Sequence, residues 1–527
     1  MKKHHTHYIK NLLFPCLSFS ALTGVFSALF ITFLKWATEQ VVSLSEWIYR
    51  IVRNNPIWLP FLILGVAAIG FISSLILSRS RVCRGGGIPS SIAAIRGITH
   101  FKWLASIVIL PFTALLTFLC GLPLGTEGPC VQMGTAVGDG TVRIFGGKKN
   151  IGWRRYIMTG GASAGFSLAT GAPITAIIFS SEEIHRSFSP LLFSVASISV
   201  LVSQITAGLL AKFGIGTTRL FHIFDLEALP LHLLFAPLVI GLVCGSCSVF
   251  FTKIYHKFDN LMRITLGKIP SKIKFPIIFS CVALIGFFIP KFLGTGHSLV
   301  DHTFEASTVW YLLIVIFLLR AIFMMLANTA GITGGIFLPT LAFGAILGAL
   351  CANLFIALGI IGSHHYILFV VLGMTAFLGA NSRIPITAAV FAVEALGGIY
   401  NILAVIVAVT ASFIIVEISG LNDFTDTVVE KKAHAVHSGK EPHIVEVPLT
   451  VHKNSFVVDK ELQDILWPVS CVVLSIEKQD PDASKTGIHE GDVLTVHYKT
   501  YNPEATAEEF EILVGKQSEE IDRIMRN

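Results

Sequence analysis

The chain of 527 residues is unusually apolar, with 53% hydrophobic and 14% charged residues, and 39 basic against 33 acidic side chains leave a formal charge of +6. This charged fraction is far below the quarter that is usual in soluble proteins, so we expect an integral membrane protein in a lipid bilayer, and the modest charge argues against a nucleic-acid partner. The 9 cysteines include no spacing typical of a metal site, and neither a metal nor another cofactor is expected.

The first predicted element is an apolar segment at residues 12–36 that follows a basic start and reads as a transmembrane helix with a cytoplasmic N-terminus. Basic clusters at residues 79–84, 148–155 and 431–432 favour the cytoplasmic side, and both termini are expected there. Further apolar segments lie at about residues 57–78, 103–124, 157–181, 187–212, 231–252, 274–291, 310–328, 334–361, 366–380 and 385–419. Several are too short for a full span or contain Gly or Pro, which predicts an all-α polytopic membrane protein with broken and re-entrant helices.

Two sequence motifs occur twice in the same order. The motif PITAxxFxxE begins at Pro173 and again at Pro385, and P-x4-G-x3-G begins at Pro129 and again at Pro339, at nearly the same separation. This pattern indicates an internal duplication, and duplicated transporters build a substrate site near the membrane midplane from discontinuous helices of both repeats. We expect a membrane domain over residues 1–433, with repeats at roughly 10–215 and 230–432.

The composition changes near residue 434, after which charged residues are frequent. Short alternating runs of the kind that predicts strands occur at residues 444–451, 471–476, 493–498 and 510–514, and residues 460–467 read as a helix. We therefore expect a linker and a small soluble α/β domain over residues 434–527.

Three glycine-rich breaks interrupt the apolar segments, at residues 85–89 (GGGIP), 125–129 (GTEGP) and 334–339 (GGIFLP). Each ends in a proline suited to the first turn of a helix, so each can direct free backbone N–H groups at one point without a full positive charge. Glu127 lies in the second break, where either its own carboxylate or a passing anion can bind at a helix N-terminus. The alternative is a carboxylate permanently paired with a buried base.

In this order the breaks resemble the GSGIP, G(K/R)EGP and GxFxP signatures of the CLC family of chloride channels and chloride/proton antiporters, over roughly residues 10–432. The resemblance implies a CLC-type inverted repeat, a homodimer in a prokaryotic inner membrane, and exchange of chloride for protons. It also implies that Glu127 is the gate and external proton acceptor and that Glu183 is the internal proton residue; alternatively, Glu183 is only solvated at the membrane edge. The implied anion-binding residues are Gly85, Gly86, Gly87, Ile336, Phe337 and Thr425.

Three positions depart from the family pattern. Gly86 replaces the central serine, Thr425 aligns with the tyrosine of the inner gate, and Thr126 replaces the basic residue before the gate glutamate. Because both side-chain donors are altered, fluoride/proton antiport is a second candidate after chloride, and a passive anion channel is the other alternative.

The C-terminal segment resembles TrkA-C regulatory domains in its stretches 462–468, 471–476 and 487–496. The resemblance implies a small-molecule or nucleotide ligand, and the alternative is a folded tail that only aids assembly. An enzyme is not expected. Residues 161–165 match the G-x-S-x-G pattern of serine hydrolases, but they lie in a small-residue run typical of helix packing, and no Walker A motif occurs.

Overall fold

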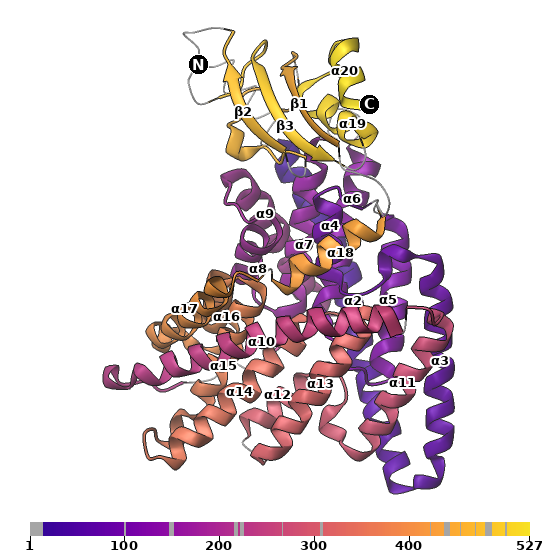
Figure 1. Ribbon diagram of the computed structural model, residues 1–527, viewed down its shortest axis with the longest axis vertical. Helices are drawn as coiled ribbons and strands as arrows, with labels where there is room; N and C mark the ends of the chain where they lie inside the picture. Colours follow the sequence, from indigo (N-terminus) through magenta and orange to yellow (C-terminus); the bar gives the residue numbers. More distant parts are fainter. Residues whose placement is uncertain are drawn as a thin grey trace.

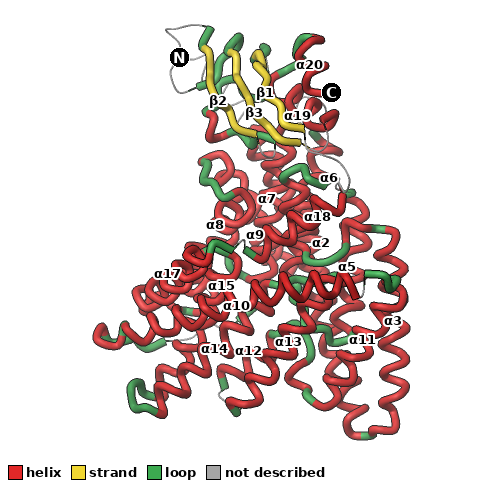
Figure 2. The backbone as a smooth tube through the Cα atoms, viewed as in Figure 1, coloured by secondary structure: helices red, strands yellow, loops and turns green. Residues whose placement is uncertain are grey.

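The computed structural model describes residues 14–99, 102–146, 152–215, 220–221, 226–265, 267–305, 309–421, 423–436, 443–453, 455–468, 471–479, 487–500 and 503–526. A broad helical body carries a small sheet domain at one end of its longest axis (Figures 1 and 2). The predicted cytoplasmic N-terminus and residues 437–442 of the predicted linker lie outside the described residues.

The helices of the body occur in two series of the same order. The first series is α2 (Phe14–Asn54), α3 (Leu59–Arg79), α4 (Gly87–Ile95), α5 (Trp103–Leu119), α6 (Glu127–Phe145), α7 (Arg154–Thr170), α8 (Pro173–Phe179) and α9 (Pro190–Ala211). The second is α10 (Phe235–Thr265), α11 (Ser271–Phe288), α12 (His297–Phe304), α13 (Trp310–Ala330), α14 (Phe337–Ala357), α15 (Tyr366–Ser382), α16 (Pro385–Leu396) and α17 (Ile402–Ser419), and α18 (Phe424–Val436) follows it. Both repeated motifs fall at corresponding helices, α6 with α14 and α8 with α16, as the predicted inverted repeat requires.

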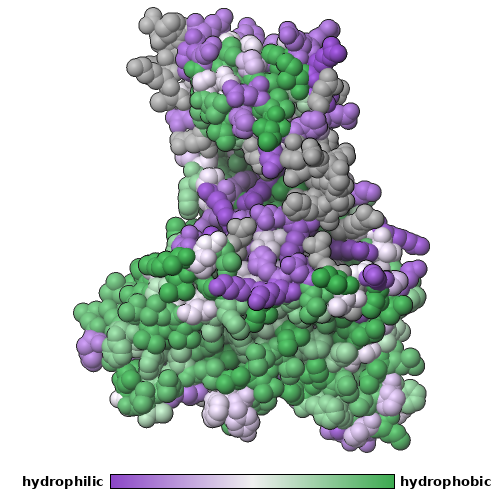
Figure 3. Space-filling model, in the orientation of Figure 1, coloured by the Kyte–Doolittle hydropathy of each residue, from purple (hydrophilic) through white to green (hydrophobic). Residues whose placement is uncertain are grey.

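The body has the surface of a membrane protein. Among the described residues, 9 helices are long and apolar enough to cross a membrane, whereas α5 and α16 are apolar but shorter. Figure 3 shows a broad hydrophobic band across this face of the body and hydrophilic residues between the band and the sheet domain. The predicted all-α polytopic fold with half-length helices is confirmed.

Two apolar segments predicted as single stretches are each divided into two helices. The segment at residues 157–181 breaks between α7 and α8 at Gly171, and the segment at 385–419 breaks between α16 and α17 at Gly397. Both glycines have left-handed backbone conformations, with φ of 73° and 82°, which end a helix at little cost only when the residue lacks a Cβ. The breaks leave α8 and α16 as short helices of 7 and 12 residues.

The C-terminal domain is a three-stranded antiparallel sheet, β1 (His443–Thr450), β2 (Cys471–Glu477) and β3 (Val493–Thr500), in the order β1-β3-β2. Helices α19 (Pro503–Val514) and α20 (Glu519–Arg526) follow, and α19 contributes to a buried core with the sheet. The three strands and the α/β class were predicted correctly.

Two local predictions in this domain are wrong. Residues 510–514 end a helix rather than form a strand, because Ala507, Phe510 and Val514 recur at helical spacing on one buried face. The helix predicted at 460–467 is only the 3-10 turn Leu462–Asp464. Pro468 disfavours helical geometry at the residue before it. The Leu466 N–H and the Trp467 carbonyl bond to side chains of α7 instead.

Candidate functional site

The three glycine-rich breaks meet inside the body. The Gly125 N–H donates to the Gly335 carbonyl at 2.8 Å and the Gly335 N–H donates to the Gly125 carbonyl at 2.7 Å, which forms a short antiparallel bridge between the repeats. The Gly85 N–H of the first break donates to the carbonyl of Gly331, three residues before the third break, at 3.2 Å. The breaks that hold Gly85, Gly86, Gly87, Ile336 and Phe337, all predicted to bind an anion, are therefore brought together.

The contact between the breaks leaves no space for side chains. A Cβ added to Gly87 would lie 1.8 Å from the Gly128 carbonyl oxygen, and a Cβ added to Gly128 would lie 2.7 Å from Gly335 Cα. Both distances are far below a van der Waals contact, so glycine is required where backbone packs directly on backbone. This requirement explains why the motifs are rich in glycine.

Three helix N-termini start at this contact. α4 begins at Gly87, α6 at Glu127 and α14 at Phe337, and in none of them does the preceding residue cap the helix with its side chain. Ile336 and Phe337 are 5% and 4% exposed. Uncapped N–H groups at a helix N-terminus carry partial positive charge, so the arrangement favours an anion without supplying a formal positive charge.

Glu127 is the first residue of α6 and is fully buried. Its Oε1 lies 3.5 Å from the Thr126 hydroxyl, while Oε2 has no hydrogen-bond partner among the described residues. The carboxylate lies against the backbone of Gly125, because a Cβ added to Gly125 would be 2.4 Å from Oε2. A buried carboxylate oxygen without a partner is costly and is characteristic of a group with a chemical role.

Glu183 and Thr425 are joined directly. Glu183 lies in a π-helical turn, Ser180–His185, that continues α8, and its Oε1 accepts a hydrogen bond from the Thr425 hydroxyl of α18 at 2.8 Å. Its Oε2 has no hydrogen-bond partner in the described part of the chain. A π-helical turn inside a helix is rare and often occurs at functional sites. The sequence predicted both residues but not their contact.

An ion network lies beside Glu183. Arg186, directly after the π-helical turn, pairs with Asp423 and Asp426 at the start of α18, and Arg96 pairs with Asp426 at 3.5 Å. The network fixes the start of α18 against the turn, so that Thr425 is held facing Glu183.

Lys432 is a further residue near the first break that sequence reasoning missed. Its Nζ donates to the Arg84 carbonyl at 3.1 Å and to the Ser90 hydroxyl, and Ser90 in turn donates to the Gly86 carbonyl at 2.9 Å. Gly86 itself offers no side-chain donor. The signal was the spacing of Thr425 and Lys432, which are two helical turns apart on one face of α18.

The repeated PITAxxFxxE motifs bind each other reciprocally. Glu394 of the second repeat accepts hydrogen bonds from the Ile174 N–H, the Thr175 N–H and the Thr175 hydroxyl at 2.7–2.8 Å. Glu182 of the first repeat accepts the corresponding three bonds from Ile386 and Thr387 at 2.6–2.9 Å. Each glutamate therefore caps the N-terminus of a helix in the other repeat, which accounts for the identical spacing of the motif in the two repeats.

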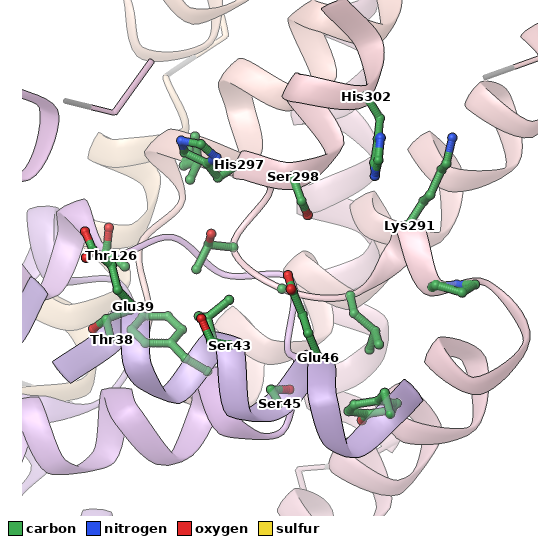
Figure 4. Close-up of a pocket in the computed structure, with 18 of the residues that line it drawn as sticks. Thr38, Glu39, Ser43, Ser45, Glu46, Thr126, Lys291, His297, Ser298 and His302 are labelled. Carbon is green, nitrogen blue, oxygen red and sulfur yellow. The ribbon is translucent and has the colours of Figure 1, made fainter. Parts of the chain in front are cut away.

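A cavity of about 570 Å³ leads toward Glu127 from the side of α2 and α12. Thr126 and Leu338 belong to its lining, and Figure 4 shows Glu39, Ser43 and Glu46 of α2 facing this space across from Ser298 of α12. In Figure 1, α12 lies at the end of the body away from the sheet domain. The cavity thus approaches Glu127 from the side opposite the sheet domain.

The C-terminal domain contacts residues on both sides of Glu183 in the sequence. On α7, the Tyr156 hydroxyl accepts from the Leu466 N–H at 2.9 Å, and Arg155 donates to the Trp467 carbonyl at 2.7 Å. Before α9, the Ser189 hydroxyl donates to Asp464 at 2.8 Å. The domain is therefore fixed to α7 and α9, which flank the π-helical turn.

Aromatic packing reinforces this interface. Phe456 contacts Trp153 and Tyr156, with ring centroids 5.5 and 5.9 Å apart, and Lys460 Nζ lies 3.3 Å from the Phe456 ring centroid. Burial lowers the pKa of Lys460 to about 7.

The serine-hydrolase pattern of the sequence receives no support from the geometry. Ser163 of the G-x-S-x-G match lies inside α7 and donates to the Thr159 carbonyl at 3.1 Å, so it is not at the strand-to-helix turn that a hydrolase nucleophile requires. Among the described residues, no group of three or more His, Cys, Asp or Glu side chains is arranged to hold a metal ion.

The arrangement resembles known proteins in both sequence and fold. The H(+)/Cl(-) exchange transporter ClcA of Vibrio campbellii is 27% identical over 428 residues, which cover 77% of this chain and 87% of the relative. ClcA of Vibrio vulnificus is 28% identical over 409 residues, covering 76% of this chain and 86% of the relative.

Two solved structures share the fold. A slow cyanobacterial Cl-/H+ antiporter superposes with a TM-score of 0.72 at 21% identity, covering 80% of this chain and 98% of the other. A CLC-type fluoride/proton antiporter superposes with a TM-score of 0.60 at 19% identity, covering 76% and 95%. The family model described as voltage gated chloride channel matches residues 69–417, more than half of the chain, and the chain therefore belongs to the voltage-gated chloride channel (CLC) family.

Proposed function

We propose that this protein exchanges chloride for protons across a membrane, with Glu127 as gate and external proton acceptor and Glu183 as internal proton residue. The observation that carries the proposal is the buried Glu127 carboxylate at the point where three uncapped helix N-termini converge. The printed functions of its relatives, H(+)/Cl(-) exchange and Cl-/H+ antiport, support the same conclusion.

Exchange follows from competition at this point. An ionised Glu127 carboxylate and an anion both favour the helix N-termini, so they exclude each other. Protonation removes the charge of the carboxylate and releases it from the anion site. Each anion that enters is therefore linked to a proton taken up by Glu127, and the affinity for one ion depends on the occupancy by the other.

The inner side offers a second competition. The Thr425 hydroxyl has one proton to donate, and it donates it to Glu183. A passing anion that accepts this hydrogen bond must take it from Glu183. Transfer of the Glu183 proton and passage of the anion therefore share one donor, which a passive channel does not require. This contact favours exchange over conduction.

Fluoride/proton exchange is the second candidate, and Gly86 is the observation that favours it. With no hydroxyl at position 86, discrimination among anions depends on the backbone N–H groups of Gly85, Gly86, Gly87, Ile336 and Phe337 and on the Thr425 hydroxyl. Chloride stands first because the relatives named above exchange it.

We place the protein in a prokaryotic inner membrane as a homodimer with both termini in the cytoplasm. Arg154 and Arg155 lie at the end of the body that contacts the C-terminal domain, and the positive-inside tendency assigns that end to the cytoplasm. The C-terminal domain, which contacts the start of α7 and the residue before α9, regulates transport on binding a small molecule or nucleotide. The chain acts as a transporter and not as an enzyme, and it uses no cofactor.

The test is ion flux in sealed vesicles reconstituted with the purified full chain. An outward chloride gradient should drive protons into the vesicles against their own gradient, and fluoride or nitrate in place of chloride gives the selectivity. Anion efflux without proton movement would instead identify a passive channel, and proton-coupled movement of fluoride but not chloride would favour the second candidate.

A further inference from the structure

Lys35 is a buried cation in an apolar helix. It lies in α2, a candidate membrane span, and is 8% exposed. Its Nζ donates to the carbonyls of Leu168 and Ala169, each at 3.1 Å, in the last turn of α7. Carbonyl groups at a helix C-terminus carry partial negative charge and stabilise a cation. A charged side chain in such a helix is costly, and by default it marks a functional site.

Lys35 lies beside the gate although it is far from it in the sequence. It lines the outer cavity together with Thr126 and Leu338. Thr126 joins this cavity to the gate, because its hydroxyl lies 3.5 Å from Glu127 Oε1. A buried cation and the residue next to the gate carboxylate therefore line one cavity.

The gate lacks the cation that its own motif usually carries. Thr126 precedes Glu127, and its hydroxyl is 3.5 Å from Oε1, longer than an ordinary O–H···O hydrogen bond. We propose that Lys35 supplies this missing charge from the neighbouring helix and acts as a positioning residue that sets the pH at which Glu127 opens the anion path. The inference rests on Glu127 being the gate, as in the function proposed above.

The direction of the effect follows from the charges around the gate. A cation favours the ionised carboxylate, so it opposes proton uptake by Glu127. The gate therefore stays closed until the external pH falls further than it would without the cation. The other titratable groups near Glu127 and Lys35 are Glu39 on α2, Cys130 on α6, and His297 with its partner Asp301 on α12. Glu39 is four residues beyond Lys35 on the same helix and opposes its charge.

The test is the dependence of anion flux on external pH in vesicles containing Lys35→Gln. Glutamine keeps hydrogen-bond donors for the two carbonyl groups but has no charge. We expect the midpoint of the flux curve to move to higher pH by about one unit, the lower end of the effect of a neighbouring opposite charge. Lys35→Arg should restore the wild-type midpoint. Arg50→Gln removes an exposed cation from the same helix and cavity, and should leave the midpoint unchanged.

Two further variants separate a role at the gate from a structural role. Glu39→Gln removes the opposing charge and should move the midpoint in the other direction, to lower pH, which keeps the proposal testable even if Lys35→Gln does not fold. In a Glu127→Gln background the Lys35→Gln change should have no effect on pH dependence, because Lys35 acts through Glu127.

An unchanged midpoint in folded Lys35→Gln would overturn the inference, and so would a shift that persists in the Glu127→Gln background. The failure of proton exchange is a separate result. A wild-type protein that moves anions without protons would contradict the exchange function, yet its pH-dependent anion flux would still report whether Lys35 sets the midpoint.

Discussion

Two pairs of glutamates occupy different regions of the membrane body. Glu182 and Glu394 lie where the re-entrant helices of the two repeats meet, and each carboxylate accepts three hydrogen bonds. Glu127 and Glu183, which we propose to lie on the pathway, each leave one oxygen without a hydrogen-bond partner in the described part of the chain. A carboxylate with all its interactions satisfied serves the fold, whereas one left unsatisfied is available for protons.

The largest effect is expected at the meeting point of the repeats. Glu182→Ala or Glu394→Ala leaves two backbone N–H groups and one hydroxyl of the other repeat without an acceptor, which should lower the free energy of unfolding by about 3–5 kcal/mol. Thermal unfolding in detergent measures this loss. Glu305→Ala, at an exposed carboxylate, is the matched control and should have little effect.

A stable Glu182→Ala variant that had lost proton transport would contradict a purely structural role for this residue, because Glu182 would then belong to the pathway.

The next effect concerns transport rather than stability. Glu183→Gln keeps the size of the side chain and its acceptor for Thr425 but cannot release a proton, so unfolding should change by less than about 0.5 kcal/mol while proton flux is abolished. Anion flux should continue. Simultaneous recording of anion and proton movement in vesicles checks this prediction, and full proton pumping by Glu183→Gln would contradict the assignment.

The smallest effect is expected outside the membrane, at Lys460. Its pKa of about 7 in the docked domain lies below the ordinary value of about 10.4, so the undocked domain binds more protons between these values. Docking should therefore strengthen as pH rises above 7, by at most about 1.4 kcal/mol per pH unit, and stay at its weakest below 7. Energy transfer between dyes on the two domains measures docking.

Lys460→Met should remove this pH dependence, whereas Lys453→Met, at an exposed lysine nearby, should not. A docking curve that kept its slope in Lys460→Met would place the titrating group elsewhere.

The parts of the site that rest on local chemistry were predictable from the sequence. Glycine and proline mark the three helix N-termini, and a carboxylate among them marks Glu127, because backbone freedom and helix polarity act over a few residues. The duplication was visible because its motifs are repeated in the chain.

The remaining features depend on contacts between distant segments. The reciprocal helix capping by Glu182 and Glu394 was not predictable, because a repeated motif shows the spacing of its own residues but not which helix its glutamate contacts. Lys35 and Lys432 were missed for the same reason: each acts on a helix that the sequence does not place beside it. In the C-terminal domain, the strand predicted at residues 510–514 failed because a five-residue apolar run does not distinguish a period of 2 from one of 3.6.

If the Glu127 carboxylate competes with the transported anion, Glu127→Gln should separate anion flux from proton flux. The measurement is simultaneous anion and proton flux in vesicles under an imposed chloride gradient, at several external pH values. Because glutamine mimics the protonated gate, we expect anion flux that no longer varies with external pH and carries no protons. A Glu127→Gln variant that still moved protons in proportion to anions, and kept the wild-type pH dependence, would contradict competition between this carboxylate and the anion.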